Sequence, residues 1–173
     1  EDVDVYTATE VTAVQCKYYE KSEYNHSIIK PAIMFMLAHF KEGWDAGRPP
    51  INYHLAGHFG SGQDKLALPI DTQFLKDNFL TVVAKKATIK KHEELGVSDA
   101  QLAEFLTRLT IDVRAEPFDS QFRAIVASAI THFECSPFAA EFFFYNNALR
   151  VIKELAINPV DSQRVITKRE FLR

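Results

Sequence analysis

Polar side chains that suit phosphate chemistry alternate with apolar residues in two short stretches near the start of the chain. Residues 2–6 (DVDVY) contribute two carboxylates, and residues 13–19 (AVQCKYY) contribute an amide and an amine. Carboxylate and amide oxygens can hold a hard cation such as Mg²⁺, which prefers oxygen ligands. Such a cation polarises a phosphate and helps to generate hydroxide from water, while a nearby ammonium group stabilises the negative charge of the transition state. The residue types therefore point to phosphodiester hydrolysis.

The alternation in both stretches has the period of a β-strand, so we expect two antiparallel strands joined by a turn centred on Thr9-Glu10. In that register Asp4 lies opposite Gln15, and Asp2 lies opposite Lys17, with all four side chains on one face of the sheet. The opposite side is then expected to face the core with Val3, Val5, Val14 and Cys16. A simpler interpretation is a surface ion pair between Asp2 and Lys17 beside a solvated Gln15.

The next segments predict a helix and a third strand. Ser27 is a typical N-cap residue, and Pro31 follows in the first turn, where proline is tolerated. Apolar residues then recur at helical spacing, at Ile29, Ala32, Ile33, Met36, Leu37 and Phe40. The segment 51–59 (INYHLAGHF) predicts a strand. The order β-β-α-β indicates an α/β core with a central sheet over residues 1–70.

Helical periodicity dominates the remainder of the chain. Ser98 and Thr167 each begin a capping-box pattern, and Ser136-Pro137 has the pattern of a helix N-terminus. We therefore expect a helical subdomain over residues 71–173. The run Phe142-Phe143-Phe144-Tyr145 covers a helix nearly all round, which predicts burial between helices or a contact between subunits. On that basis we expect a homo-oligomer, most simply a dimer.

Two further groups of residues are candidates for a site. His54 and His58 have the spacing of a helical metal pair, but in a strand they would lie about 13 Å apart. We therefore expect structural or surface roles for them, with His54 as a candidate for the rim of the site. A basic cluster either contacts DNA phosphates or forms a solvated surface, and it comprises Lys85, Lys86, Lys90, Lys91 and His92.

The composition is that of a globular domain. Apolar residues make up 47% and charged residues 25%, which argues against disorder, and the net charge of −3 excludes a uniformly basic coat for nucleic acid. The two cysteines, Cys16 and Cys135, exclude a disulfide scaffold and a Cys-rich zinc site. No apolar run is long enough to span a membrane and no signal peptide is recognisable. We expect a cytoplasmic protein without membrane contact.

The motif Val14-Gln15-Cys16-Lys17, preceded by the acidic strand, resembles the PD-(D/E)XK nuclease superfamily in its QxK form, as in Mrr-like restriction endonucleases. A closer likeness is to the double-stranded-DNA nuclease domain of bacterial anti-phage defence effectors. Residues 145–150 (YNNALR) and 164–172 (RVITKREFL) are also similar to that family. The resemblance implies a restriction-endonuclease-like mixed-sheet core and hydrolysis of double-stranded DNA with Mg²⁺, or Mn²⁺ in its place.

The resemblance carries over to few positions. Asp4 matches the metal-binding acid, with Asp2 as the alternative, and Gln15 matches the variable second ligand. Lys17 matches the catalytic lysine, and the backbone carbonyl of Cys16 is expected to face the metal. The family core begins with a helix and a strand before the acidic strand. We therefore expect a piece of a longer protein whose nuclease core is N-terminally incomplete, associated with an NTPase or sensor module. The alternative is a non-catalytic scaffold that binds DNA or assembles a larger complex.

Overall fold

The computed structural model of the chain describes residues 3–84, 87–160 and 163–171. The chain divides into two compact units, Glu1–Ala115 and Glu116–Arg173. This division falls further along the chain than the boundary near residue 70 that helical periodicity indicates. The elements between residues 71 and 115 pack within the first unit, because several of their apolar side chains belong to its core.

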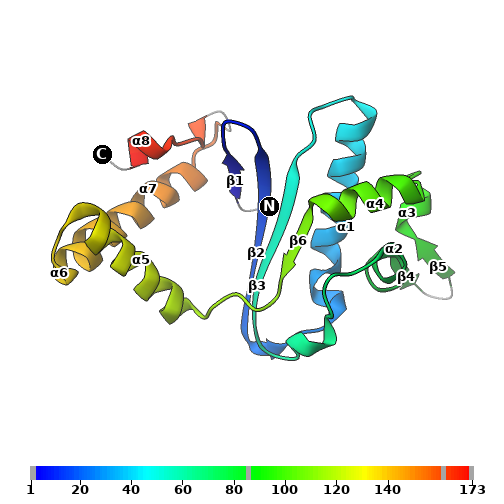
Figure 1. Ribbon diagram of the computed structural model, residues 1–173, viewed down its shortest axis with the longest axis horizontal. Coiled ribbons are helices and arrows are strands. Elements are labelled where there is room, and N and C mark those ends of the chain that lie inside the picture. The colour runs from blue at the N-terminus through cyan, green and yellow to red at the C-terminus, as the bar shows by residue number, and fades with distance from the viewer. Residues whose placement is uncertain (1–2, 85–86, 161–162, 172–173) are drawn as a thin grey trace. The chain divides into compact units, whose positions relative to one another are not determined.

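The first unit is a mixed α/β structure built on a four-stranded sheet in the order β1-β2-β3-β6 (Figure 1). β1 (Val3–Tyr6) pairs antiparallel with β2 (Val11–Glu23), whereas β3 (Asn52–Ser61) is parallel to β2 and β6 (Leu109–Asp112) is parallel to β3. The long helix α1 (His26–Asp45) connects β2 to β3 and lies along one face of the sheet. The predicted β-β-α-β order is confirmed.

Helix α1 begins two residues earlier than its sequence suggests, with Asn25 and not Ser27 as its N-cap. The side-chain oxygen of Asn25 accepts a hydrogen bond from the backbone N–H of Ser27 at 3.1 Å. Pro31 is the sixth residue of this helix and lies beyond its first turn, so the prediction of a proline in the first turn is wrong. The helix continues past Pro31 with one intrahelical hydrogen bond fewer. The predicted apolar stripe is confirmed, since all six of its members are buried: Ile29, Ala32, Ile33, Met36, Leu37 and Phe40.

The face of the sheet that packs against α1 carries the polar residues of β2. In β3, Tyr53, Leu55 and Phe59 are buried in one cluster with the apolar stripe of α1. β2 runs parallel to β3 with Ala13 opposite Tyr53 and Gln15 opposite Leu55. Residues that are opposite each other in a parallel pair share a face, so Gln15 projects toward the helix-covered side.

The expectation that the apolar residues of the first two strands face the core is therefore wrong. Val3 is 52% exposed and Val5 is 46% exposed. The Cys16 side chain is exposed and Val14 is half-buried. The larger apolar residues of β3 (Tyr53, Leu55 and Phe59) lie on the sheet face opposite to that of Val14 and Cys16. Their packing against α1 determines which side of β2 is covered.

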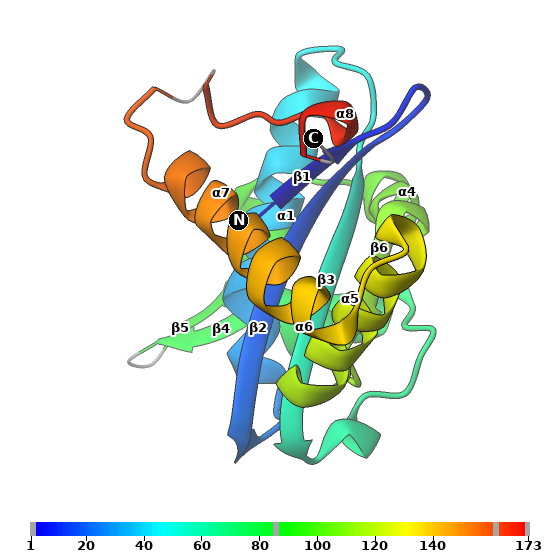
Figure 2. The same ribbon diagram turned by 90° about the vertical axis from the view of Figure 1, so that its left-hand side faces the viewer.

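Short elements complete the first unit. They are the 3₁₀ turn η1 (Gln63–Lys65), α2 (Thr72–Phe74), the π-helical segment η2 (Leu75–Leu80), the hairpin of β4 (Thr81–Ala84) and β5 (Ala87–Lys90), α3 (Lys91–Glu94) and α4 (Asp99–Arg108). The capping box at Ser98 is confirmed, because Ser98 and Gln101 exchange both hydrogen bonds. The β4–β5 hairpin and β6 correct the expectation of helix alone in this part of the chain. Figure 2 shows the hairpin extending away from the main sheet.

The second unit is helical. α5 (Phe118–Phe133) is followed by α6 (Pro137–Ala139), the π-helical segment η3 (Ala140–Tyr145) and α7 (Asn146–Ala156), and then by α8 (Lys168–Phe171). The predicted starts at Ser136 and Thr167 are confirmed by their capping hydrogen bonds. Aromatic rings join α5 to η3: Phe133 stacks on Phe144 with centroids 4.2 Å apart. Among the described residues of this unit only Ala140 is buried.

Within the described part of the chain, no helix has both the length and the apolar character needed to cross a membrane.

Candidate active site

The hairpin of β1 and β2 brings the candidate residues to one face of the sheet, but in a register different from the expected one. Asp4 lies opposite Ala13 instead of Gln15. The reason is the turn: the Thr7 hydroxyl accepts the Glu10 N–H at 3.0 Å, and the Thr7 N–H donates to the Glu10 carbonyl at 2.9 Å. This tight reversal moves the pairing by two residues. Because side chains alternate with a period of two, Asp4 still shares a face with Gln15.

Asp2, the alternative metal-binding acid, and its predicted pairing with Lys17 lie outside the described residues.

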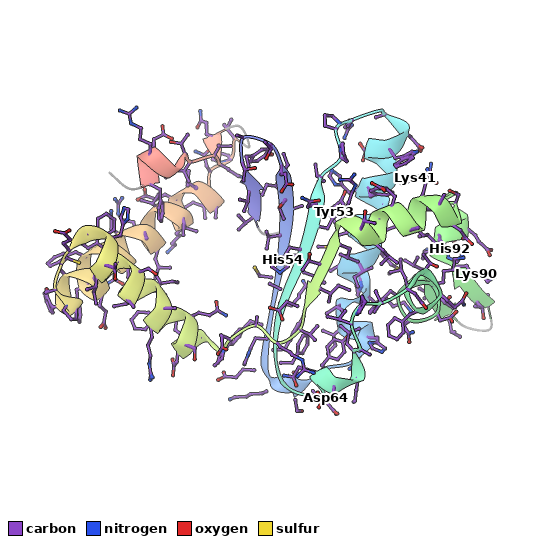
Figure 3. All side chains as sticks on the ribbon, viewed as in Figure 1. Lys41, Tyr53, His54, Asp64, Lys90 and His92 are labelled. Atoms are coloured by element: carbon purple, nitrogen blue, oxygen red, sulfur yellow. The ribbon has the colours of Figure 1, made fainter. Side chains whose placement is uncertain are left out.

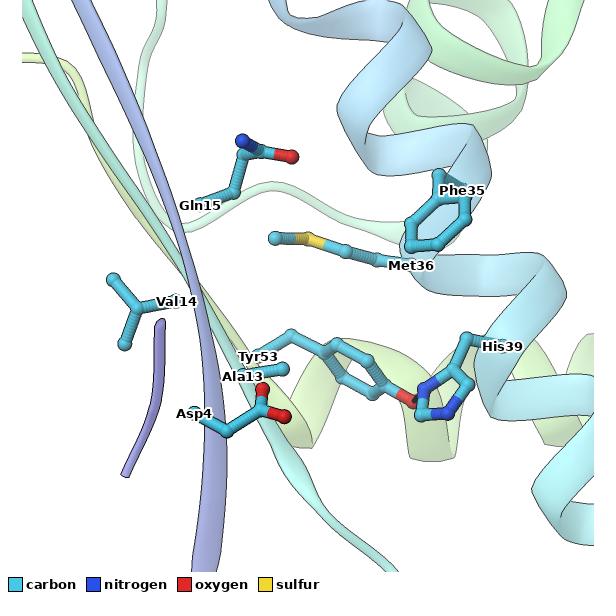
Figure 4. Close-up of a pocket in the computed structure, with 8 residues that line it drawn as sticks. All are labelled: Asp4, Ala13, Val14, Gln15, Phe35, Met36, His39 and Tyr53. Carbon is cyan, nitrogen blue, oxygen red and sulfur yellow. Dashed lines mark hydrogen bonds between the residues drawn. The ribbon is translucent and has the colours of Figure 1, made fainter. Parts of the chain in front are cut away.

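A cavity of about 130 Å³ opens where this face meets α1. Asp4 and Gln15 line it from the strands, Met36 and His39 line it from α1, and Tyr53 lines it from β3 (Figure 4). Ala13, Val14 and Phe35 complete the lining. A space of this size holds several water molecules, which suits a hydrated ion or a phosphate group more than a whole nucleoside. The structure thus brings Asp4 and Gln15 together as predicted.

Lys17 lies on the same face of β2, one side-chain repeat beyond Gln15. The two Cα atoms are therefore about 7 Å apart. Lys17 is half-buried, lies opposite Gly57 of β3 and is not among the residues that line the cavity. A Cβ atom at Gly57 would stand 2.9 Å from Cε2 of Phe59, so the Phe59 ring takes the space beside Gly57. The lysine therefore shares the face of Gln15 but does not line the cavity.

Cys16 separates the two polar residues on β2. It lies opposite Ala56, and its exposed side chain projects from the face opposite to that of Gln15. Its thiol therefore takes no part in the cavity, and only its backbone carbonyl has a candidate role. That role remains a prediction.

The donor set is compatible with Mg²⁺. In the described part of the chain, no group of three or more His, Cys, Asp and Glu side chains is placed to hold a metal ion. Mg²⁺ commonly takes one or two carboxylates and completes its shell with water and substrate phosphates. One carboxylate from Asp4 and one amide oxygen from Gln15 match that pattern, as does the oxygen of a backbone carbonyl.

The cavity also contains a hydrogen-bonded pair that the sequence interpretation missed. The hydroxyl of Tyr53 is 3.1 Å from Nδ1 of His39, and the two rings meet edge to face with centroids 6.0 Å apart. Tyr53 is only 3% exposed. Burial raises the pKa of Tyr53 to about 12, although the positive charge of Arg108 acts in the opposite direction. No local sequence signal marks His39, because its place beside Tyr53 depends on how α1 packs against β3.

The histidines of β3 do not belong to the cavity. β3 is a strand as predicted, and His54 projects from the opposite face to Tyr53 (Figure 3). His54 is also not among the cavity-lining residues, so the suggestion that it forms the rim is wrong. His58 stacks on Tyr18 with centroids 5.0 Å apart and donates from Nδ1 to the Ala115 carbonyl at 2.7 Å. These are structural roles, as expected.

The positive charges of the two described lysines in the basic cluster are compensated by ion pairs with glutamates. Lys90 pairs with Glu93 at 2.9 Å, and Lys91 pairs with Glu94 at 2.6 Å. His92 is 8% exposed, so it is a core residue and does not belong to a basic surface. Lys85 and Lys86 lie outside the described residues. The described residues therefore offer weak support for a phosphate-binding patch here.

No protein-family model matches the chain, and neither does a curated protein sequence or a solved structure. Functional inference therefore rests on the residues and their geometry.

Proposed function

We propose that the chain is a restriction-endonuclease-like nuclease domain of the QxK type, which hydrolyses phosphodiester bonds of double-stranded DNA with Mg²⁺ or Mn²⁺. The observation that carries this proposal is the shared cavity of Asp4 and Gln15, with Lys17 on the same face of the same sheet. The mixed sheet with α1 between two parallel strands is the context in which the QxK motif is expected. A cytoplasmic anti-phage defence protein that contains an NTPase or sensor module is the setting that the resemblance implies.

Each residue has a distinct role in this proposal. The Asp4 carboxylate and the Gln15 amide oxygen hold the cation, together with the Cys16 carbonyl. When bound, the cation polarises the phosphate and makes a bound water easier to deprotonate. The Lys17 side chain projects from the same face of β2 as Gln15, and in this proposal its ammonium stabilises the charge that develops on the phosphate and positions the attacking water.

The proposal is tested by Asp4→Asn in the full-length protein, with cleavage of a supercoiled plasmid measured over a range of Mg²⁺ concentrations. The substitution removes the negative charge at nearly constant volume, so we expect a large increase in the Mg²⁺ concentration needed for half-maximal cleavage. Asp64→Asn is the matched control, because the Asp64 carboxylate is exposed and pairs with Arg114 away from the cavity. DNA binding without cleavage at any Mg²⁺ or Mn²⁺ concentration would favour the non-catalytic scaffold instead.

We also propose that the second unit mediates contact with a second copy of the chain. Three aromatic side chains on α6 and η3 contact one another and are each more than half exposed, and they form an aromatic patch: Phe138, Phe142 and Phe143. Phe144 is less exposed because it stacks on Phe133 within the unit. An exposed aromatic patch usually marks an interface, and a symmetric pair of chains would supply the same patch from both copies.

A further inference from the structure

The His39–Tyr53 pair is the part of the cavity to which the proposed function gives no role. His39 lies on the same side of α1 as Phe35 and Met36, one turn further along the helix, and all three line the cavity. Figure 4 shows the Asp4 carboxylate on the strand side of the cavity and the His39 ring on the helix side, with the Tyr53 ring between them. His39 is exposed, whereas Tyr53 is buried.

The hydrogen bond between the two residues determines which nitrogen of His39 carries the proton. A buried phenol whose pKa is raised to about 12 keeps its proton at neutral pH. Among the described residues, His39 is the hydrogen-bond partner of this hydroxyl, so the phenol proton is satisfied only when it is donated to His39. Nδ1 of a neutral His39 then accepts from the Tyr53 hydroxyl at 3.1 Å. A neutral imidazole has one donor and one acceptor nitrogen, so Nε2 carries the N–H. The nitrogen that remains for a ligand is thus a donor, and a donor suits a phosphate oxygen.

We propose that His39 is a substrate-contacting residue of this site, and that its Nε2–H donates a hydrogen bond to an oxygen of the phosphate bound beside Asp4. In this arrangement Tyr53 is a positioning residue, because its hydroxyl fixes the tautomer and the ring orientation of His39. The inference rests on the proposed phosphodiesterase function. It adds a residue from the helix to a site otherwise assembled from the two strands.

The alternative is that the His39–Tyr53 pair has only a structural role at the edge of the core, where Tyr53 contacts Phe105 with ring centroids 5.6 Å apart. In that case His39 could be replaced without an effect on cleavage. The exposure of His39 makes this testable, because its removal leaves the buried ring of Tyr53 in place.

The experiment compares His39→Ala, His39→Gln and the control His54→Ala in the full-length protein, with kcat and KM for Mg²⁺-dependent cleavage of duplex DNA. We expect His39→Ala to lower kcat on the order of 10²-fold, as for loss of one donor to a developing oxyanion. His39→Gln, whose amide keeps an N–H donor, should recover part of that loss. His54→Ala should cleave normally, because His54 projects from the other face of the sheet.

A spectroscopic readout tests the positioning role without reference to cleavage. The ¹⁵N shifts of labelled histidine report the tautomer, and we expect His39 to be protonated on Nε2 in the wild-type protein. Tyr53→Phe keeps the ring and removes the hydroxyl, so the signal should move toward a mixture of tautomers and kcat should fall about 10-fold.

Failure of this inference and failure of the proposed function give different results. Normal kcat in His39→Ala, with an active wild-type protein, overturns the role of His39 and leaves the nuclease proposal intact. An Nδ1–H tautomer in the wild-type protein overturns the positioning role of Tyr53. A wild-type protein that cleaves no DNA with either cation overturns the proposed function and the role of His39 together.

Discussion

Two tyrosine hydroxyls in the first unit are buried and hydrogen-bonded to histidine nitrogens. Tyr24 is 2.9 Å from Nδ1 of His26, and Tyr53 is 3.1 Å from Nδ1 of His39. Burial raises the pKa of each tyrosine to about 12. Since an unfolded chain ionises its tyrosines near pH 10, the stability that comes from these two protonated phenols is fully present below about pH 10. It is lost as the pH rises toward 12.

We therefore expect the free energy of unfolding to fall between about pH 10 and 12, on the order of 2 kcal/mol for each buried tyrosine. Urea unfolding across this pH range measures the fall, and the ultraviolet absorbance of tyrosinate measures the titration. The chain has six tyrosines, and two of them should ionise late in the folded protein. Tyr53→Phe should remove one late step. A single titration of all six near pH 10 would contradict the burial of these hydroxyls.

At the same scale, the sequence indicates that Asp4 and Gln15 share a face, because strand alternation is local information, but it does not indicate that this face is the one covered by α1. The sequence also does not indicate their register, since that depends on the hydrogen bonds of the Thr7 side chain. His39 was also not foreseeable as a cavity residue. Its role depends on Tyr53, which a separate element places beside it.

At the scale of elements, close approach of the β2 and β3 backbones makes Gly60 irreplaceable. A Cβ atom at Gly60 would lie far inside van der Waals contact with the backbone carbonyl of Glu20 in β2. Gly60→Ala should therefore destabilise the protein by about 1–3 kcal/mol, since backbone would have to shift. Gly43 in α1 is the matched control because nothing lies within 4 Å of its added Cβ. Gly43→Ala should stabilise by about 0.5–1 kcal/mol.

Urea denaturation of both variants measures these differences. Equal stability of Gly60→Ala and the wild-type protein would contradict the observed spacing of β2 and β3.

Elements with a strong hydrophobic periodicity were predictable from the sequence. Elements whose structure depends on pairing with residues far away in the sequence were not. The stripe of α1 follows from 3.6-residue periodicity alone. The covered face of β2 depends on its pairing with β3, which lies beyond the whole of α1 in the sequence. β6 is a strand of four residues directly after α4, and its parallel pairing with β3 outweighs the helical pattern before it.

At the scale of the whole molecule, the exposed aromatic patch of the second unit predicts self-association. Phe142→Asp places a charge in the patch, at a side chain that is 52% exposed, so the fold should persist while the dimer dissociates. Val83→Asp in β4 is the control, because Val83 is 79% exposed and lies outside the patch. Sedimentation velocity over a range of protein concentrations distinguishes the two variants. A wild-type protein that remains monomeric at every concentration would contradict this contact.

The central claim is that the residues on the helix-covered face of β1 and β2 hydrolyse DNA, and Lys17 tests it most directly. The measurement is the rate of Mg²⁺-dependent cleavage of duplex DNA by the full-length wild-type protein, by Lys17→Ala and by Lys21→Ala. Lys21 is the matched control, because it is an exposed lysine further along the same strand. We predict that Lys17→Ala lowers the rate by at least about 10²-fold with its fold intact, and that Lys21→Ala cleaves normally. Cleavage by Lys17→Ala at the wild-type rate would contradict the account.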